Sequence, residues 1–310
     1  MIFLWIASAA LALIVAAIII SYICFRITFY VPNRVVAPNE KIDIPEGEIY
    51  EPFRDQMEAW IIEARQMNPK KYYIKSFDGL TLCGKFFEHS PDAEIELMFH
   101  GYRGNSERDL SGAVQRCFNL GRSAFIVDQR GSCESEGNVI TFGINEHKDC
   151  LSWIDFIIKE FGQDVKIIIT GISMGASTVL MAAGKNPPAN VVGVLCDCGF
   201  TSAKEIINKV MRQMKIPPKL AYPFVKLGAK LFGKFDLEEY SAIEAARECK
   251  IPVIFFHGES DDFVPCEMSR KNYEACASRK QIVTTPNAGH GLCFLIDNEG
   301  YYKAVREFFK

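Results

Sequence analysis

One serine of the chain lies between two glycines in a pattern that could expose its hydroxyl to a substrate. Residues 171–175 read Gly-Ile-Ser-Met-Gly, with Ser173 at the centre. The pattern follows an apolar run at 165–170 and opens a helix-like segment, and a sharp turn from a strand to a helix pushes the central side chain outward. Small glycines on both sides let the backbone make that strained turn. We therefore expect Ser173 to be a nucleophile.

A serine hydroxyl is a poor nucleophile unless a base takes its proton, and the chain has five histidines. His290 lies in the loop after the last apolar run, where the ligand sites of open α/β sheets are found. The base needs an acid that orients it. The loop at 257–265, which follows another apolar run, contains two candidates. Asp261 is the expected acid, and Asp262 is the alternative. Ser173, Asp261 and His290 would then each lie at the end of a strand.

The negative charge that develops on a substrate oxygen needs hydrogen-bond donors. The segment His-Gly-Tyr-Arg-Gly at 100–104 follows the apolar run at 95–99. The backbone N–H groups of Tyr102 and Met174 are the expected donors. We expect His100 to brace this loop rather than to take part in the reaction.

Metal chemistry finds little support in the sequence. The 11 cysteines include no Cys-x-x-Cys pair, and no second Cys or His pair near Cys196 and Cys198 completes a zinc site. We expect no metal and no cofactor, and we expect the cysteines to be reduced and buried. The net charge of −3 at pH 7 argues against a protein that coats nucleic acid.

The elements that must hold these residues alternate along the chain. Short apolar runs, typical of strands buried on both faces, alternate with helical segments. This alternation predicts a mostly parallel sheet with helices on both faces. A hairpin signal, Asp78-Gly79, precedes them. The predicted strands are 95–99, 124–127, 165–170, 191–195, 251–256 and 281–284. The predicted helices are 107–120, 144–161, 174–185, 241–248, 266–278 and 297–309.

Residues 200–240 interrupt the alternation with two helix-like pieces, which we interpret as a small helical lid. Between Thr201 and Phe235 there are eight Lys or Arg residues and one acid, Glu205, interleaved with apolar side chains. A basic amphipathic lid can lie on an anionic membrane surface. The alternative is an ordinary solvated lysine face over a packed helix pair. The basic residues are Lys204, Lys209, Arg212, Lys215, Lys219, Lys226, Lys230 and Lys234.

The first 25 residues carry no charged side chain, and the first charge belongs to Arg26. A helix of that length measures roughly 37 Å, against about 30 Å of bilayer hydrocarbon. We therefore predict a transmembrane helix at 1–25. A cleaved signal peptide is the weaker interpretation, because it would have a basic start, a shorter apolar stretch and a small-residue cleavage site. The aromatic residues expected at the membrane interface are Tyr22, Phe25, Phe29 and Tyr30.

A linker and a lead-in helix are predicted at 26–69, with the helix at 51–66, and the main domain is predicted at 70–310. Arg26 and Arg34 lie on the C-terminal side of the membrane helix. By the positive-inside rule, we expect a single-pass membrane protein whose main domain is cytoplasmic.

Several motifs, in their order along the chain, resemble those of the α/β-hydrolase superfamily. They are His-Gly-Tyr-Arg-Gly, Asp-Gln-Arg-Gly followed by Ser-Glu-Gly, Gly-Ile-Ser-Met-Gly, His-Gly-Glu-Ser-Asp-Asp-Phe-Val-Pro and Gly-His. The chain is similar in particular to the serine-aminopeptidase-like and small-lid esterase branch over about residues 70–310. The resemblance implies an α/β-hydrolase fold with an eight-stranded sheet, the nucleophile Ser173, the acid Asp261 and the base His290. Cys133 departs from the pattern, since such loops usually carry glycine there.

The resemblance also implies cleavage of esters, thioesters or amides through an acyl-enzyme. We expect a serine hydrolase that cleaves a carboxylic ester or thioester, with a small-molecule or lipid-like acyl ester as its substrate. Two alternatives stay open. One is a peptidase of the same fold, which would need a group that binds a free amine. The other is a catalytically silent, membrane-bound scaffold.

Overall fold

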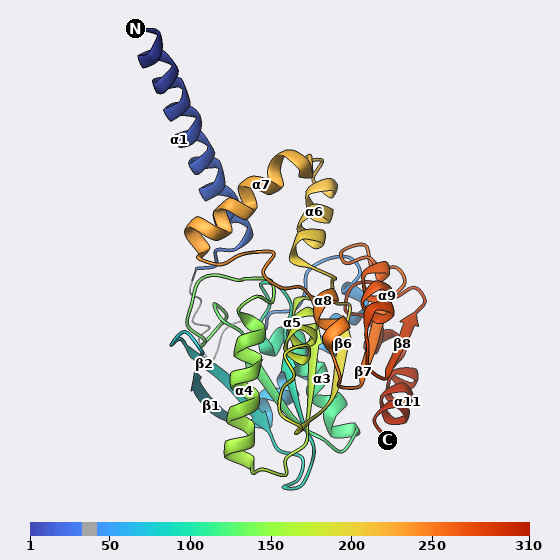
Figure 1. Cartoon of the computed structure of the whole chain (residues 1–310). Helices are drawn as coiled ribbons and strands as arrows, with labels where there is room; N and C mark the ends of the chain where they lie inside the picture. Colours follow the sequence, from blue (N-terminus) through green and yellow to red (C-terminus); the bar gives the residue numbers. More distant parts are fainter. Residues whose placement is uncertain (33–41) are drawn as a thin grey trace.

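A single sheet of eight strands forms the centre of the computed structural model, which describes residues 1–32 and 42–310. The strands are β1 (Lys70–Lys75), β2 (Thr81–Phe87), β3 (Ile95–Phe99), β4 (Ser123–Asp128), β5 (Ile167–Ile172), β6 (Val191–Asp197), β7 (Val253–Gly258) and β8 (Lys280–Thr285). Their spatial order is β1-β2-β4-β3-β5-β6-β7-β8 (Figure 1). Only β2 runs antiparallel to both of its neighbours, and the strands from β4 to β8 are parallel. This arrangement confirms the expected mostly parallel sheet.

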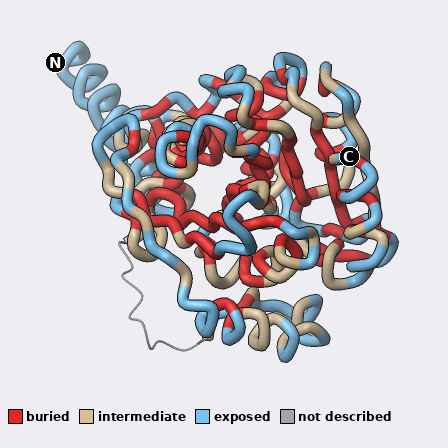
Figure 2. Tube along the Cα trace, turned by 90° about the horizontal axis from the view of Figure 1, so that it is seen from below, coloured by how far each residue is buried: buried red, intermediate tan, exposed pale blue. Residues whose placement is uncertain are grey.

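Helices cover both faces of the sheet, which explains why its central strands are mostly apolar. Every residue of β3, β4 and β7 is buried, and Figure 2 shows this buried layer inside an exposed shell. On one face lie α3 (Ser106–Asn119) and α11 (Asn298–Phe308), and the short α10 (Cys293–Ile296) directly precedes α11. On the other face lie α4 (Glu146–Phe161), α5 (Met174–Ala183), α8 (Ala242–Glu248) and α9 (Cys266–Ala275). The helix predicted at 266–278 ends earlier, because Cys276 adopts an extended conformation that leads into β8.

A short helical segment precedes the sheet and packs on its outer layer. It consists of a single 3₁₀ turn, η1 (Glu51–Phe53), followed by α2 (Arg54–Gln66). Trp60 of α2 lies against Gly112 of α3, where a Cβ atom would overlap the indole ring. The absence of a side chain at Gly112 therefore lets the two helices approach closely.

Two helices occupy the predicted insertion. They are α6 (Ala203–Gln213) and α7 (Pro218–Gly228), and α7 continues into a π-helical turn, η2 (Ala229–Gly233). Figure 1 shows them standing clear of the sheet, above the edge at which its parallel strands end. We call residues 203–233 the lid.

The N-terminal helix α1 (Ile2–Thr28) is long and apolar enough to span a membrane, and its first part projects freely from the domain (Figure 1). It continues past the boundary predicted at residue 25. Its last turns pack on the lid, where a Cβ at Gly228 would overlap the backbone carbonyl oxygen of Ser21. The helix is therefore joined to the domain by direct packing as well as by the chain that follows it.

Two of the four aromatic residues predicted at the membrane interface lie in the protein core instead. Phe25 is 5% exposed and Phe29 is fully buried. The ring of Phe29 lies edge-on to those of Phe142 and Phe235, with ring centroids 5.8 and 5.3 Å apart. The sequence could not reveal this, because Phe142 and the lid reach α1 only in the folded chain. Tyr22 does remain exposed.

The C-terminal end of α1 also contacts the loop at 100–104. The hydroxyl of Tyr102 donates a hydrogen bond to the carbonyl oxygen of Thr28 at 2.7 Å. The guanidinium of Arg103 donates one to the carbonyl oxygen of Ile27, also at 2.7 Å. These side chains satisfy carbonyl groups that the end of a helix leaves without partners. Part of the predicted linker, residues 33–41 including Arg34, lies outside the described residues.

Candidate active site

Ser173 lies at the sharp turn between β5 and α5, in a strained backbone conformation. Its φ of 56° and ψ of −118° lie outside the regions that a serine normally adopts. The turn is held by a hydrogen bond of 2.8 Å from the Ser173 amide to the carbonyl oxygen of Asp197 at the end of β6. Such strain persists only where the surrounding structure enforces it, and it is common at functional sites.

The two glycines around Ser173 are required by close backbone contacts. A Cβ at Gly171 would overlap the carbonyl group of Gly175. A Cβ at Gly175 would overlap the carbonyl oxygen of Phe99 on β3. The first residues of α5 therefore lie directly against the ends of two strands, which explains why the sequence has glycine at both positions.

The structure brings the three predicted residues into one hydrogen-bonded row, although they come from separate loops. His290 Nε2 lies 2.9 Å from Ser173 Oγ. His290 Nδ1 lies 2.7 Å from Asp261 Oδ2. A histidine with this pair of contacts can accept the serine proton on one nitrogen while the carboxylate orients the ring through the other.

Asp261 is the carboxylate that contacts the histidine, and its side chain is fully buried. Its Oδ1 atom accepts hydrogen bonds from the amides of Phe263 and Val264 at 2.9 and 2.8 Å. Burial by itself would raise the pKa of this carboxyl, but hydrogen bonds from His257 and His290 outweigh burial and hold the pKa well below its ordinary value. Asp261 is thus kept ionised. The alternative acid, Asp262, is exposed at the surface.

The loop at 100–104 lies next to Ser173. A Cβ built at Gly101 would be 3.5 Å from the Cβ of Ser173. Asp109 holds the loop in place by accepting a hydrogen bond of 2.9 Å from the Gly101 amide. Among the described residues, the amides of Tyr102 and Met174 donate to no other protein group. These two amides are therefore free to donate to a ligand.

His100 braces this loop, as its sequence position suggested. Its Nδ1 lies 2.9 Å from the carbonyl oxygen of Gly101, and its Nε2 accepts a hydrogen bond of 3.0 Å from the amide of Gln129. The Gln129 side chain in turn donates to the carbonyl oxygen of His100 at 2.6 Å. Because His100 is fully occupied in this way, it has no nitrogen left for a substrate.

The backbone conformation of Cys133 explains why similar loops usually carry glycine at this position. Its φ is 46°, in the left-handed region that glycine adopts without cost. The neighbouring Ser135 hydroxyl accepts a hydrogen bond of 2.9 Å from the Cys83 amide and donates one to the carbonyl oxygen of Asp128. The turn therefore forms despite the cysteine.

Two residues that were not predicted from the sequence contact the hydrogen-bonded row of Ser173, His290 and Asp261. The buried His257 places its Nε2 3.2 Å from Asp261 Oδ2 and 2.8 Å from the carbonyl oxygen of Val264. Because both neighbours are acceptors, this nitrogen carries the proton. The hydroxyl of Tyr50 donates a hydrogen bond of 3.0 Å to the carbonyl oxygen of His290. The spacing of His257 from Asp261 could have suggested the first contact, but nothing in the sequence around Tyr50 suggests the second.

One group of side chains at the site has the atoms to hold a metal. The ligand atoms of Cys198, Asp261 and His290 all lie within 4.8 Å of one another. However, burial raises the pKa of the Cys198 thiol well above its ordinary value, so the thiolate that a metal needs is disfavoured. Asp261 and His290 already hydrogen-bond to each other. The arrangement fits proton transfer better than metal binding.

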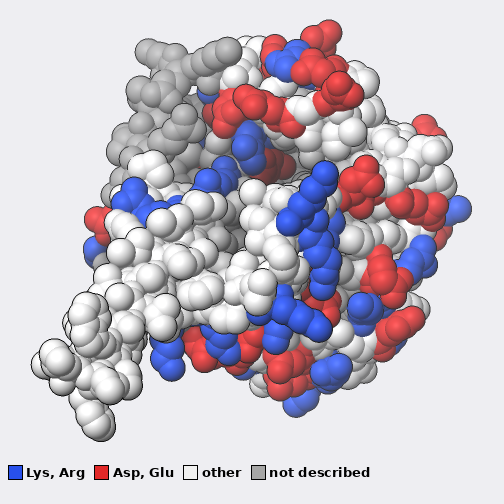
Figure 3. Space-filling view, turned by 90° about the horizontal axis from the view of Figure 1, so that it is seen from above, with Lys and Arg blue, Asp and Glu red and all other residues white. Residues whose placement is uncertain are grey.

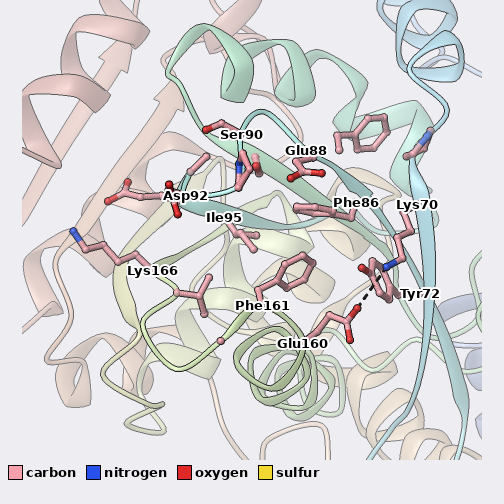
Figure 4. Close-up of a pocket in the computed structure, with 18 of the residues that line it drawn as sticks. Lys70, Tyr72, Phe86, Glu88, Ser90, Asp92, Ile95, Glu160, Phe161 and Lys166 are labelled. Atoms are coloured by element: carbon pink, nitrogen blue, oxygen red, sulfur yellow. Dashed lines mark ion pairs between the residues drawn. The ribbon is translucent and has the colours of Figure 1, made fainter.

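A cavity of about 210 Å³ opens beside Ser173 and His290. Met57 and Trp60 of α2 form part of its wall, so the lead-in segment closes the site on one side. A larger hollow of about 1010 Å³ lies at the opposite edge of the sheet, beside the Lys70–Glu160 ion pair (Figure 4). The described residues that line this hollow include no histidine and so no base of the kind found beside Ser173.

Comparisons with known proteins agree with the fold. A family model described as the alpha/beta hydrolase fold matches residues 97–233. The uncharacterized protein YqkD of Bacillus subtilis is 24% identical over 244 residues, which cover 78% of this chain and 80% of YqkD. The esterase Pf2001 of Pyrococcus furiosus superposes with a TM-score of 0.65 at 18% identity, covering 91% of this chain and 97% of the esterase.

A peptidase has the same fold. The acylaminoacyl peptidase of Pyrococcus horikoshii superposes with a TM-score of 0.57 at 18% identity, covering 78% of this chain and 41% of the peptidase. At such identities, a structural likeness shows the fold and leaves the substrate open. The family model, the strand order and the strained serine after β5 lead to one conclusion: the chain has the α/β-hydrolase fold.

Proposed function

We propose that this protein is a serine hydrolase that cleaves a carboxylic ester or thioester through an acyl-enzyme. Ser173 attacks the carbonyl carbon while His290 takes its proton, and His290 then returns the proton to the leaving group. Asp261 orients the imidazole and stabilises its positive charge. The amides of Tyr102 and Met174 stabilise the oxyanion. Water completes the cycle by hydrolysing the acyl-enzyme, with His290 again as the base.

One observation carries this proposal: the continuous row of hydrogen bonds from Ser173 Oγ through His290 to Asp261, with distances of 2.9 and 2.7 Å. A catalytically silent scaffold would not require this geometry, nor the backbone strain at Ser173. Two described carboxylates line the cavity beside the row, but Asp109 is bound by Arg108 and the Gly101 amide, and Asp197 is buried near the positive charge of Arg116. Neither is free to bind a substrate amine, so ester cleavage is preferred to removal of N-terminal residues.

Fluorophosphonate labelling tests the proposal directly, because only an activated serine reacts rapidly with this probe. The full chain in detergent is the appropriate sample, since Phe25 and Phe29 are part of the core. We expect a stoichiometric adduct that peptide mass spectrometry maps to Ser173.

A panel of p-nitrophenyl esters and aminoacyl p-nitroanilides then separates the two hydrolase classes. We expect the esters to have the higher kcat/KM. Faster turnover of the amides would reverse this order and favour the peptidase. Absence of any adduct on correctly folded protein would instead favour the silent scaffold.

We further propose that α1 spans a membrane and that the lid lies on the surface of the same bilayer. The apolar α1 ends against α7, so a bilayer around α1 would come close to the lid. Figure 3 shows Lys and Arg side chains across this face, next to the projecting part of α1, which carries no charged side chain before Arg26. The basic residues on this side favour a cytoplasmic main domain by the positive-inside rule.

The charges of the lid divide into paired and free groups. Lys204 and Lys226 form ion pairs with Glu238 at 2.9 and 2.5 Å, and Lys209 donates to the backbone carbonyl of Asp262. Four cations of the lid are exposed and form no ion pair with described residues, as is also the case for Lys234 directly after it. The four are Arg212, Lys215, Lys219 and Lys230. Exposed apolar side chains lie among them: Met214, Ile216, Leu220, Leu227 and Leu231. This mixture is typical of surfaces that bind anionic membranes.

Charge reversal in the lid tests its contact with lipid. In the full chain reconstituted into vesicles, the K215E/K219E double variant should lose most of any preference for anionic over zwitterionic vesicles. Each cation near an anionic surface contributes about 1 kcal/mol, and 1.4 kcal/mol corresponds to a factor of ten. Loss of two cations should therefore lower the ratio of kcat/KM on the two vesicle types at least about thirtyfold.

The matched control for the lid is K159E/K250E, which reverses two exposed lysines outside it. This variant should retain the lipid preference of the unaltered protein. Equal ratios for the lid variant, the control and the unaltered protein would show that the lid is an ordinary solvated face.

A further inference from the structure

The backbone at the expected oxyanion donor, the amide of Tyr102, receives little support from other backbone groups. Among the described residues, neither Tyr102 nor Arg103 forms a backbone–backbone hydrogen bond. Arg103 has a φ of 54°, in the left-handed region that is costly for residues other than glycine. Such a conformation persists only where its surroundings enforce it. Side-chain contacts must therefore hold this part of the loop.

The side chains of both residues reach the C-terminal end of α1. The hydroxyl of Tyr102 donates a hydrogen bond to the carbonyl oxygen of Thr28 at 2.7 Å. The guanidinium of Arg103 donates to the carbonyl oxygens of Ile27 and Tyr30 at 2.7 and 3.3 Å. The last carbonyls of a helix have no partner within it, so they are available as acceptors. The negative end of the helix dipole also favours the positive charge of Arg103.

This end of α1 is itself fixed to the main domain and can serve as a support. The amide of Ile140 donates a hydrogen bond of 2.8 Å to the carbonyl oxygen of Phe29, which is fully buried. Phe142 lies between the helix and the loop, because its ring centroid is 5.8 Å from that of Phe29 and 5.0 Å from that of Tyr102. The ring and the hydroxyl of Tyr102 are thus both held against groups that cannot shift independently of the core.

We propose that the C-terminal end of α1 positions the oxyanion donor, and that Tyr102 and Arg103 act as positioning residues through their side chains. The proposal rests on the ester hydrolase function given above. An oxyanion donor must lie about 2.7–3.1 Å from the developing charge, so a small displacement of the amide weakens it. Tyr102 lines the same cavity as Ser173, and its contacts with α1 keep its amide there. The helix that anchors the protein therefore contributes to kcat as well as to location.

The Y102F/R103M double variant of the full chain removes both side-chain donors to α1 and keeps both backbone amides. Loss of a whole oxyanion donor costs about 10²–10³ in kcat, and a donor that is present but loosely held should cost less. We expect kcat for the preferred p-nitrophenyl ester to fall about ten- to a hundredfold, with KM nearly unchanged. The Y102F/R103K variant keeps a cationic donor at residue 103 and should recover part of this loss.

A second measurement, in which sulfur replaces the carbonyl oxygen of the same ester, separates positioning from a general effect on folding. Sulfur accepts hydrogen bonds weakly, so the thiono ester gains little from the oxyanion donors. The ratio of kcat/KM for the oxygen ester to that for the sulfur ester therefore reports on the donors, since unfolded protein lowers both values equally. We expect this ratio to fall about tenfold in Y102F/R103M.

The matched control removes the same two kinds of group at the end of another helix, α3. There the hydroxyl of Tyr302 accepts a hydrogen bond of 2.8 Å from the side chain of Asn119, and Arg306 donates to the carbonyl oxygen of Asn119 at 3.0 Å. The Y302F/R306M variant should retain the kcat and the oxygen-to-sulfur ratio of the unaltered protein. A ratio that fell equally in both double variants would contradict a specific role of α1.

Fluorophosphonate labelling of the same samples separates the two levels of the proposal. If the unaltered protein labels at Ser173 but Y102F/R103M keeps its oxygen-to-sulfur ratio, the hydrolase function stands and the positioning role of α1 is wrong. If the unaltered protein neither labels nor hydrolyses esters, the hydrolase function is wrong and the positioning role falls with it.

Discussion

Replacing Ser173 by alanine is expected to lower kcat for ester hydrolysis by about a million-fold. The change removes the only atom that can form the acyl-enzyme and leaves His290 and the oxyanion donors in place. A residual rate of about 10³–10⁴ above the uncatalysed reaction should persist, because the free amides still stabilise the oxyanion of a water attack. KM should change little, since the hydroxyl contributes little to ground-state binding.

The matched control is S90A, which removes an exposed serine hydroxyl at the opposite edge of the sheet. Its kcat should equal that of the unaltered protein. Thermal unfolding of S173A must be recorded alongside its kinetics, since a lost fold would mimic lost chemistry. A folded S173A that retained even a hundredth of the activity would show that Ser173 is not the nucleophile.

The second large effect is expected at the acid: D261N should lower kcat by about 10⁴-fold. An asparagine fits the same space, but its amide group can present N–H to His290 Nδ1, where the carboxylate now accepts at 2.7 Å. The imidazole is then held in the tautomer whose Nε2 carries a proton and cannot receive one from Ser173. Steady-state kinetics on the ester preferred by the unaltered protein measures this loss.

The neighbouring Asp262 provides the control. Its side chain is exposed, and its backbone carbonyl accepts hydrogen bonds from Lys209 and Gln213, which D262N would keep. We expect D262N to retain full activity. If D262N lost more activity than D261N, the roles given to the two acids would have to be exchanged.

The difference in unfolding free energy between the unaltered protein and D261N should also depend on pH. The pKa of Asp261 is lower in the folded protein than its unfolded value of about 3.9. Its charge therefore stabilises the fold above about pH 4, and this contribution is lost as the pH falls toward the folded pKa. The difference in unfolding free energy between the unaltered protein and D261N should accordingly narrow on acidification below pH 4, as measured by denaturant titration.

The order of strands and helices was predictable because each element has a local signal. Strands buried on both faces are continuous apolar runs, and the predicted run at 95–99 coincides with β3. The glycines around Ser173 have an equally local cause, because the turn after β5 excludes any side chain there. The approach of Ser173, Asp261 and His290 could also be anticipated, because parallel strands place the loops that follow them at one edge of the sheet.

The environment of the site was not predictable in this way. Tyr50 contacts His290 across 240 positions of sequence. Phe29 reads as an interfacial aromatic, yet it lies in the core because Phe142 and Phe235 surround it. The periodicity of the sequence does not predict such contacts between distant residues, because they depend on how separate elements pack.

The sequence by itself determined the alternating α/β order, the strained turn at Ser173 and the identity of the groups that follow the strands. These features depend on backbone sterics and on hydrophobic periodicity, which act over a few residues. Only the tertiary structure decided that Asp261 rather than Asp262 faces His290, that α1 packs on the lid, and that Arg116 and Asp197 line one cavity. These outcomes depend on close packing between residues distant in the chain, where shape and burial in three dimensions select the contacts.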